Sequence, residues 1–323
     1  MTAEGRPLAT TFYREIDRNR RRSWVLVVAV AIVLGVFGGV IGFATGIDWF
    51  GVVLAVAIAA VMTVGSYFGG DALVMATSAA REVDTSQPAE KYRQLVNVVE
   101  EMRLAGGLPR PRVWVIDDSA PNAFATGRDA QHASIAVTTG LLDKLDREQL
   151  QGVIGHEMSH IGNLDIRFTL LVGVLVGSIA LLADWFLRFT FWGGGRRGGS
   201  GNDRGGGGGG AALLFVLALV LAVLAPLIAR IIQAAVSRSR ESLADASAVE
   251  LTRNPVALAR ALRTIADDRE VLEVANRATQ HLYIVNPIKS FEERAKSLWD
   301  THPPIGERIR ALEAMGAQAG ITR

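Results

Sequence analysis

Long uncharged runs of apolar residues dominate the hydrophobic pattern of this chain. A helix crosses the hydrocarbon core of a bilayer with about 20 apolar residues, and four runs reach or approach that length: 23–47, 49–70, 168–183 and 211–229. The third run reaches it only if Asp184 lies at the interface, beside the aromatic side chains of Trp185 and Phe186. The pattern therefore predicts four transmembrane helices in two hairpins, rather than four buried core helices.

The first run is longer than the apolar region of a cleaved signal peptide, and a second span follows almost at once. We therefore expect it to be retained. The expected organisation begins with a basic tail at 1–22 and a first hairpin at 23–70, followed by the first part of a catalytic domain at 71–167. A second hairpin at 168–229, with a glycine-rich outer loop at 193–210, and the second part of the catalytic domain at 230–323 complete it.

The segments outside the hairpins have the composition of a soluble domain. A helix is predicted over 88–107, ended by Gly106-Gly107, and short β-like runs follow at 113–116, 122–126 and 133–138. Asp146 and Gln149 have the spacing of a helix cap. In the last part of the chain, Asn254-Pro255 opens a helix and an amphipathic helix follows the break at 302–304.

Positive charge is concentrated before the first predicted span, although the net charge is only +2. Cytoplasmic flanks of spans carry an excess of Lys and Arg, so six arginines predict a cytoplasmic N-terminus: Arg6, Arg14, Arg18, Arg20, Arg21 and Arg22. The arginines of the outer loop oppose this orientation but are outnumbered. A nucleic-acid-binding tail is the alternative, and next to a span the orientation signal explains these charges better, so we expect a lipid bilayer and no nucleic acid as partner.

The stretch 193–210 is dominated by glycine and is predicted to be a linker, because no strand precedes it and no Lys-Ser/Thr pair follows it, as a phosphate-binding loop would require. The chain contains no cysteine. Disulfides, thiolate metal sites and thiol catalysis are therefore excluded.

The motif His156-Glu157-Met158-Ser159-His160 carries the candidate chemistry. Residues four apart lie on one face of a helix, so both imidazoles can reach one metal ion. Zinc binds imidazole readily and keeps an open position for water in catalytic sites. Glu157 is placed to remove a proton from that water. Two surface histidines are the alternative, but the apolar residues around the motif predict a buried helix.

A candidate for the third ligand lies far along the chain, where Glu241 and Asp245 are four residues apart. Glu241 could bind the metal while Asp245 orients a ligand histidine. The alternative is a solvated helix face on which Arg238 and Arg240 pair with these acids, and spacing alone leaves both open. The predicted second hairpin favours the metal, because its two crossings bring His160 and Glu241 to the same membrane face, within about 10–20 Å of the bilayer core.

Together these segments resemble the HtpX family of bacterial membrane-bound zinc metalloproteases, relatives of the gluzincins Ste24 and Oma1. The resemblance covers most of the chain and includes the paired spans, the histidine motif and three further segments: Asn122-Ala123-Phe124-Ala125-Thr126-Gly127, Glu241 to Asp245, and Thr301-His302-Pro303-Pro304 leading to Arg308. It implies a mainly α-helical integral membrane protein, with four transmembrane helices and an α+β zincin-like catalytic domain containing a small β-sheet.

The resemblance also implies roles for individual residues. His156, His160 and Glu241 are expected to bind one Zn²⁺ per chain, with Glu157 as the general base. The strand of Asn122, Ala123, Phe124, Ala125 and Thr126 is expected to be an edge to which extended substrate pairs. His302 and Arg308 are candidates for stabilising the oxyanion; alternatively, His302 caps a turn and Arg308 pairs with an acid. His132 and His281 are expected to be structural or surface residues. The long glycine-rich loop departs from simpler relatives.

We therefore expect a zinc-dependent endopeptidase of the bacterial plasma membrane that cuts membrane proteins, and also soluble chains, on the cytoplasmic face. The quality-control role under stress rests on the resemblance alone. One alternative is a catalytically silent membrane scaffold with a structural metal, although such sites need four protein ligands. A transporter is a third, but its spans should carry ionisable residues at mid-depth, and these spans are nearly free of them.

Overall fold

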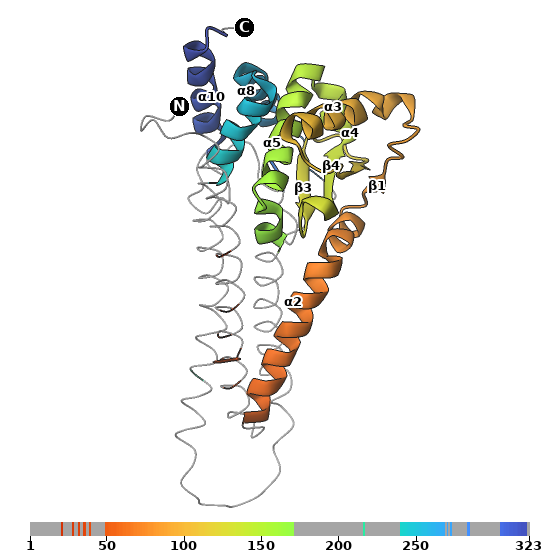
Figure 1. The fold of residues 1–323 in the computed structure, drawn as a ribbon, viewed down its shortest axis with the longest axis vertical. Coiled ribbons are helices and arrows are strands. Elements are labelled where there is room, and N and C mark those ends of the chain that lie inside the picture. The colour runs from red at the N-terminus through yellow and green to blue at the C-terminus, as the bar shows by residue number, and fades with distance from the viewer. Residues whose placement is uncertain are drawn as a thin grey trace, which may run out of the picture. The chain divides into compact units, whose positions relative to one another are not determined.

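The computed structural model describes residues 49–170, 240–268 and 304–321, together with single residues outside these ranges, among them Tyr283 and Ile284. The chain divides into two compact units. One consists of 1–22, 67–170 and 233–323, and the other of 23–66 and 171–232. The first unit contains every strand that the structure describes (Figure 1).

The second predicted span lies in the helix α2, Trp49–Thr77, which continues past its expected end. Among the residues that the structure describes, no helix is both long enough and apolar enough to cross a membrane. The glycine-rich loop and nearly all of the other three predicted spans lie outside the described residues. The four spans and the domain boundaries derived from them therefore stay predictions.

A small mixed sheet lies in the first unit, as the short β-like runs predicted. Its strands are β1 (Arg81–Glu82), β2 (Arg112–Ile116), β3 (Ala123–Gly127) and β4 (Ala133–Thr138), in the order β1-β2-β4-β3. β2 runs parallel to β4, and the other two pairs are antiparallel. Within the described chain, β3 is thus an outer strand. β1 was not predicted, because two residues carry no detectable alternation.

The connection between β3 and β4 is tight and contains the 3-10 helix η1 (Ala130–His132). Gly127 has a φ of 143°, and a Cβ at this position would lie 2.3 Å from the carbonyl oxygen of His132. Only glycine fits this turn without strain. The turn therefore fixes the register with which β3 pairs with β4.

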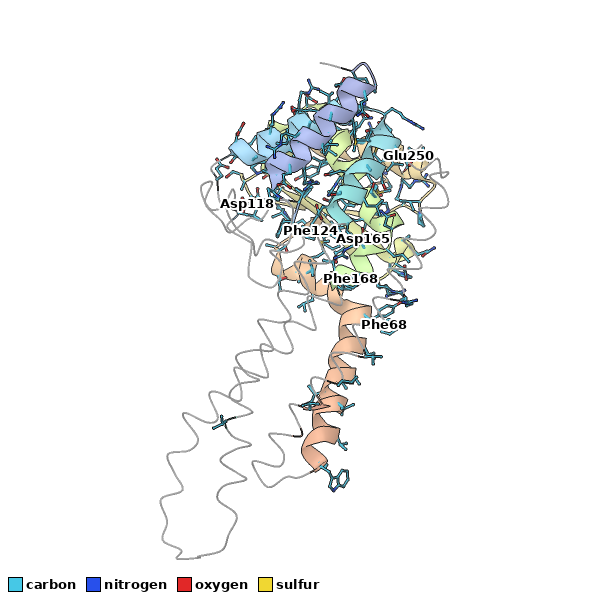
Figure 2. The ribbon with its side chains drawn as sticks, turned by 90° about the vertical axis from the view of Figure 1, so that its left-hand side faces the viewer. Phe68, Asp118, Phe124, Asp165, Phe168 and Glu250 are labelled. Carbon is cyan, nitrogen blue, oxygen red and sulfur yellow. The ribbon has the colours of Figure 1, made fainter. Side chains whose placement is uncertain are left out.

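Helices cover one face of the sheet. They are α3 (Glu90–Gly106), α4 (Thr139–Lys144), α5 (Arg147–Gly162), α8 (Pro255–Asp267) and α10 (Ile305–Gln318), and residues 240–252 are also helical. Successive side chains of a strand point to opposite faces. Val113, Val115, Ile135 and Val137 accordingly join the helices in the main core. Phe124 and Ala136 point the other way and pack with Met75, Leu272 and Tyr283; Figure 2 shows Phe124 within this unit.

The helix ends follow the local sequence signals. Asp146 and Gln149 form the predicted reciprocal cap of α5. The side chain of Asn254 caps α8, with Pro255 in the first turn. Gly107 ends α3 in the left-handed conformation that glycine adopts without strain. These caps fix where α5 begins and therefore which of its residues face the core.

We predict that Gly152→Ala destabilises the first unit. A Cβ on Gly152 would lie 2.9 Å from the main chain of Leu258, so α5 and α8 would have to move apart. Overpacking of this kind costs about 1–3 kcal/mol. Thermal unfolding of the purified full-length protein in detergent would show a lower Tm.

The matched control is Gly69→Ala in α2, where no atom lies within 4 Å of the added Cβ. Alanine is favoured over glycine inside a helix by about 1 kcal/mol, so this variant should keep or raise the Tm. Equal Tm values for the two variants would contradict the close α5–α8 packing.

Candidate metal centre

Helix α5 brings the two motif histidines together inside the unit. His156 and Glu157 are buried, and His160 is partly buried. The Nε2 atoms of His156 and His160 lie 3.2 Å apart, with the two rings nearly perpendicular. The prediction that the motif helix is buried is confirmed.

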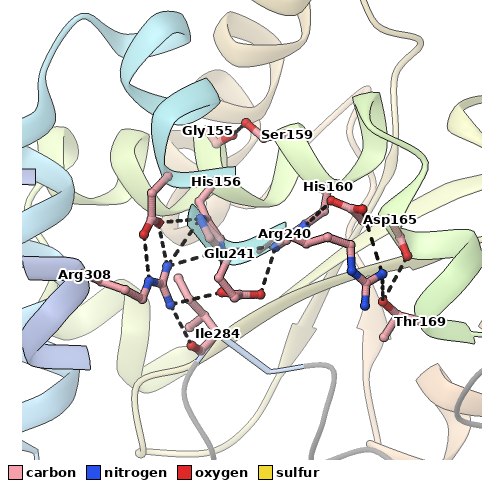
Figure 3. A network of polar contacts seen from close by, with 11 residues as sticks. Gly155, His156, Ser159, His160, Asp165, Thr169, Arg240, Glu241, Ile284 and Arg308 are labelled. Atoms are coloured by element: carbon pink, nitrogen blue, oxygen red, sulfur yellow. Dashed lines mark hydrogen bonds and ion pairs between the residues drawn. The ribbon is translucent and has the colours of Figure 1, made fainter. Parts of the chain in front are cut away.

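Glu241 reaches both histidines from the helical segment 240–252, as Figure 3 shows. Its Oε2 lies 3.5 Å from Nε2 of His156, and its Oε1 lies 3.6 Å from Nε2 of His160. The three donor atoms all fall within 4.8 Å of one another. Arg240, Glu241 and Asp245 are buried, so these residues do not form the solvated helix face that spacing left open.

The donor set fits a small tetrahedral cation. Ligands at about 2.0–2.1 Å in tetrahedral geometry are separated by about 3.3 Å, close to the 3.2 Å between the two Nε2 atoms. The carboxylate of Glu241 lies opposite them, with Oε2 3.5 Å from Nε2 of His156 and Oε1 3.6 Å from Nε2 of His160. The chemistry also fits. Nδ1 of His160 lies 3.1 Å from Oδ2 of Asp165, and an ionised carboxylate only accepts hydrogen bonds. Nδ1 therefore carries the proton, and the lone pair of Nε2 points at His156.

The sequence pattern did not predict a role for Asp165, because a residue five positions after His160 points away from it on a continuous helix. It is 2% exposed and lies at the start of the next helical stretch. The sequence nevertheless contains a signal for the contact between Asp165 and His160. Gly162-Asn163 favours a turn, and a turn allows a carboxylate five positions after His160 to return to it.

Asp245 and Arg308 surround the other histidine. Oδ1 of Asp245 lies 3.0 Å from Nδ1 of His156. The guanidinium of Arg308 donates to both oxygens of Asp245, at 2.7 and 2.8 Å, and lies 3.2 Å from Oε2 of Glu241. Of the two readings considered for Arg308, the structure therefore shows pairing with acids near the site.

The electrostatics favour a positive charge between the donors. Burial and the charge of Arg308 lower the pKa of His156, but the carboxylates of Asp245 and Glu241 outweigh them and raise it to about 9. Of these two acids, Glu241 faces the Nε2 atoms of both imidazoles, whereas Asp245 lies at Nδ1 of His156. Burial raises the pKa of Glu157, although the two histidines act against that rise. Arg308 holds the pKa of Asp245 below its usual value despite burial.

The strand expected to bind substrate lies next to the motif helix. Residues 122–126 are all buried, and the main-chain amide of Ala125 donates to the carboxylate of Glu157. The carbonyl of Asn122 accepts from Thr138 in β4. Because main-chain groups alternate along a strand, the carbonyls of Ala123 and Ala125 point away from β4. The amide of Ile284 donates to the first of these at 2.9 Å.

Two further histidines of the sequence analysis, His281 and His302, lie outside the described residues. His132 is exposed at the end of η1, and its Nδ1 lies 2.6 Å from Asp129. That contact belongs to the turn between β3 and β4, as expected for a structural histidine.

Comparison with known proteins places this site in a family. The model of peptidase family M48 matches residues 89–316. A protein named Protease HtpX homolog from Dictyoglomus thermophilum is 39% identical over 306 residues, which are 95% of each chain. Homologs of the same name from Listeria monocytogenes serotype 4b and Levilactobacillus brevis are 42% and 43% identical, each over 94% of this chain and 99% of the relative.

Among solved structures, the crystal structure of S. mikatae Ste24p matches with a TM-score of 0.48 and 17% identity, over 90% of this chain and 67% of that chain. The sequence matches alone confirm the resemblance to HtpX proteases drawn from the motifs. The chain therefore belongs to peptidase family M48 and is a metalloprotease.

Proposed function

We propose that this metalloprotease is a zinc-dependent endopeptidase, with one Zn²⁺ per chain held by His156, His160 and Glu241. The observation that carries the proposal is the pair of Nε2 atoms 3.2 Å apart, with the Glu241 carboxylate facing both. Two lone pairs at that distance repel each other unless a cation lies between them. Two imidazoles and one carboxylate are a donor set that zinc uses in catalytic sites.

Glu157 is the proposed general base. A bound zinc ion supplies Lewis-acid chemistry and lowers the pKa of water at the site to about 7. The Glu157 carboxylate then accepts a proton from the attacking water and delivers it to the leaving amine. Burial raises its pKa, so it holds this proton better than an exposed glutamate would. The amide of Ala125 orients the carboxylate for the transfer.

Extended polypeptide substrates are proposed to pair with the outer edge of β3, through Asn122, Ala123, Phe124, Ala125 and Thr126. Strand addition to a sheet edge supplies main-chain hydrogen bonds in any sequence context. Residues 122–126 are buried in this structure, so the residues that cover this edge must move aside for a substrate. The carbonyls of Ala123 and Ala125 point to that side, and Ala125 contacts the base. A substrate that uses the Ala123 carbonyl competes with the amide of Ile284.

Asp245 and Arg308 are proposed to support the metal ligands rather than the substrate. The bidentate contact between them fixes Asp245 against His156, and Arg308 also holds Glu241. His302 then remains the candidate for stabilising the oxyanion.

We place the enzyme in the bacterial plasma membrane, with its N-terminus and active site on the cytoplasmic side. The four apolar runs and the basic tail support this placement. The proposed substrates are membrane proteins, and also soluble chains, in quality control under stress; this role is proposed only from the resemblance to the HtpX family.

The silent scaffold remains the second candidate. A closed structural site would use four protein donors, whereas the described residues supply a cluster of three. A metal that exchanges with water and is removed by a chelator, with loss of hydrolysis, would favour the enzyme.

The first prediction for the site concerns the base. Glu157→Gln should keep zinc, because Glu157 is not a donor in the cluster, and should lower the peptidase rate by about 10²–10⁴-fold. Zinc content by elemental analysis and cleavage of an unfolded protein substrate test this. Glu148→Gln is the control, since Glu148 is an exposed glutamate of the same helix. Full activity of Glu157→Gln would remove it as the base.

The second prediction concerns the third ligand. Glu241→Ala should weaken zinc binding itself, because the ion loses a charged donor that faces both histidines. Titration with a competing chelator measures the affinity. An unchanged zinc content after dialysis against that chelator would exclude Glu241 from the ligand set.

The third prediction concerns topology. The chain contains no cysteine, so single-cysteine variants report one position each. In intact cells, Ser200→Cys in the outer loop should react with a membrane-impermeant maleimide. Thr2→Cys in the basic tail should react only after lysis, and the reverse pattern would contradict the proposed orientation.

A further inference from the structure

We propose that Asp165 is a positioning residue of the metal centre. Its carboxylate holds His160 with Nε2 turned toward His156 and Glu241, and through Arg240 it connects the segment carrying the histidines to the segment carrying Glu241. This inference rests on the proposed zinc site, and nothing in the recognised motif assigns a role to Asp165.

The hydrogen bond to His160 sets which nitrogen can bind a cation. Oδ2 of Asp165 accepts from Nδ1 of His160 at 3.1 Å. Asp165 is 2% exposed, so water does not compete for this contact. The bond orients the ring and leaves the lone pair of Nε2 for the metal, as carboxylates behind histidine ligands do in other zinc sites.

A strained turn makes this contact possible. On an uninterrupted helix, a residue five positions after His160 would lie about 140° away around the axis. The helix α5 instead ends at Gly162, and Leu164 adopts a φ of 58°. For a residue with a side chain, this left-handed conformation costs about 1–2 kcal/mol. The turn at Leu164 returns Asp165 toward His160, which gives the strain a structural reason.

The second oxygen of Asp165 faces Arg240. Oδ1 lies 3.9 Å from Nη1 of Arg240, which also lies 3.5 Å from Oγ1 of Thr169. The guanidinium stacks 4.3 Å above the ring of Phe168. Arg240 immediately precedes Glu241 in the chain. Asp165 therefore contacts one proposed ligand directly and the neighbour of another, as the network in Figure 3 shows.

Each of the two histidines is contacted by a carboxylate that also contacts an arginine. His156 has a carboxylate, Asp245, that is paired with Arg308, and His160 has Asp165 beside Arg240. The two arginines come from different parts of the chain and both lie close to Glu241 in space or in sequence. Each carboxylate–arginine pair thus fixes one histidine relative to the third ligand.

The test is zinc affinity of the full-length protein in detergent, measured against a competing chelator, with the visible spectrum of the Co²⁺-loaded protein as a second readout. Asp165→Ala should bind zinc about 10–100-fold more weakly and should change the Co²⁺ spectrum. Asp165→Asn should restore most of the affinity, because its amide oxygen can accept the same hydrogen bond. Asp118→Asn is the control, since Asp118 is a buried aspartate that accepts from the amide of Ala120, and its zinc affinity should equal that of the unchanged protein.

Wild-type affinity and spectrum in Asp165→Ala would overturn the inference, and so would an Asp165→Asn variant as weak as the alanine variant. If Asp165→Ala does not fold, as judged by circular dichroism, Asp165→Asn carries the test: loss of the negative charge behind His160 should still shift the Co²⁺ spectrum, Asp118→Asn should not shift it, and identical spectra for these two variants would overturn the inference. An unchanged protein that binds no zinc would instead sink the proposed function, so the two failures are distinguishable.

Discussion

The site depends on one electrostatic constraint: two imidazole nitrogens face each other at 3.2 Å in a buried place, with a carboxylate opposite both. Such a group of lone pairs and negative charge is stable only around a cation, whether a proton or a metal. The pKa of His156 is raised because the nearby carboxylates stabilise its protonated form. The chain belongs to a metalloprotease family, and the three donors lie close enough together to hold a metal ion in place of that proton.

The fold meets this constraint by holding two segments that are far apart in the sequence next to each other. Capping by Asp146 fixes the start of α5 and hence the direction of the histidines. The close packing of Gly152 against Leu258 fixes α5 against α8, which follows the segment of Glu241. β3 completes the arrangement, because the amide of Ala125 reaches the proposed base.

Much of this arrangement could be predicted from local patterns. The spacing of His156 and His160, the caps of α5 and α8, and three of the strands each depend on residues close in sequence. Long-range pairing could not be predicted in the same way. The order of the strands and the short strand β1 depend on contacts between distant segments, and spacing could not show whether Glu241 faces solvent or the histidines. Asp165 was missed because its contact requires the turn at Leu164.

The three donors of the candidate metal cluster come from two segments that are far apart in the chain, and Arg308, which contacts the third donor, lies further along still. Synthesis proceeds from the N-terminus, so a nascent chain contains both histidines and Glu157 well before Glu241 has been made. The three donors cannot come together until the second predicted hairpin has been translated, and Arg308, which contacts Glu241, is translated later still. The proposed metal cluster therefore cannot form in a nascent chain that still lacks Glu241.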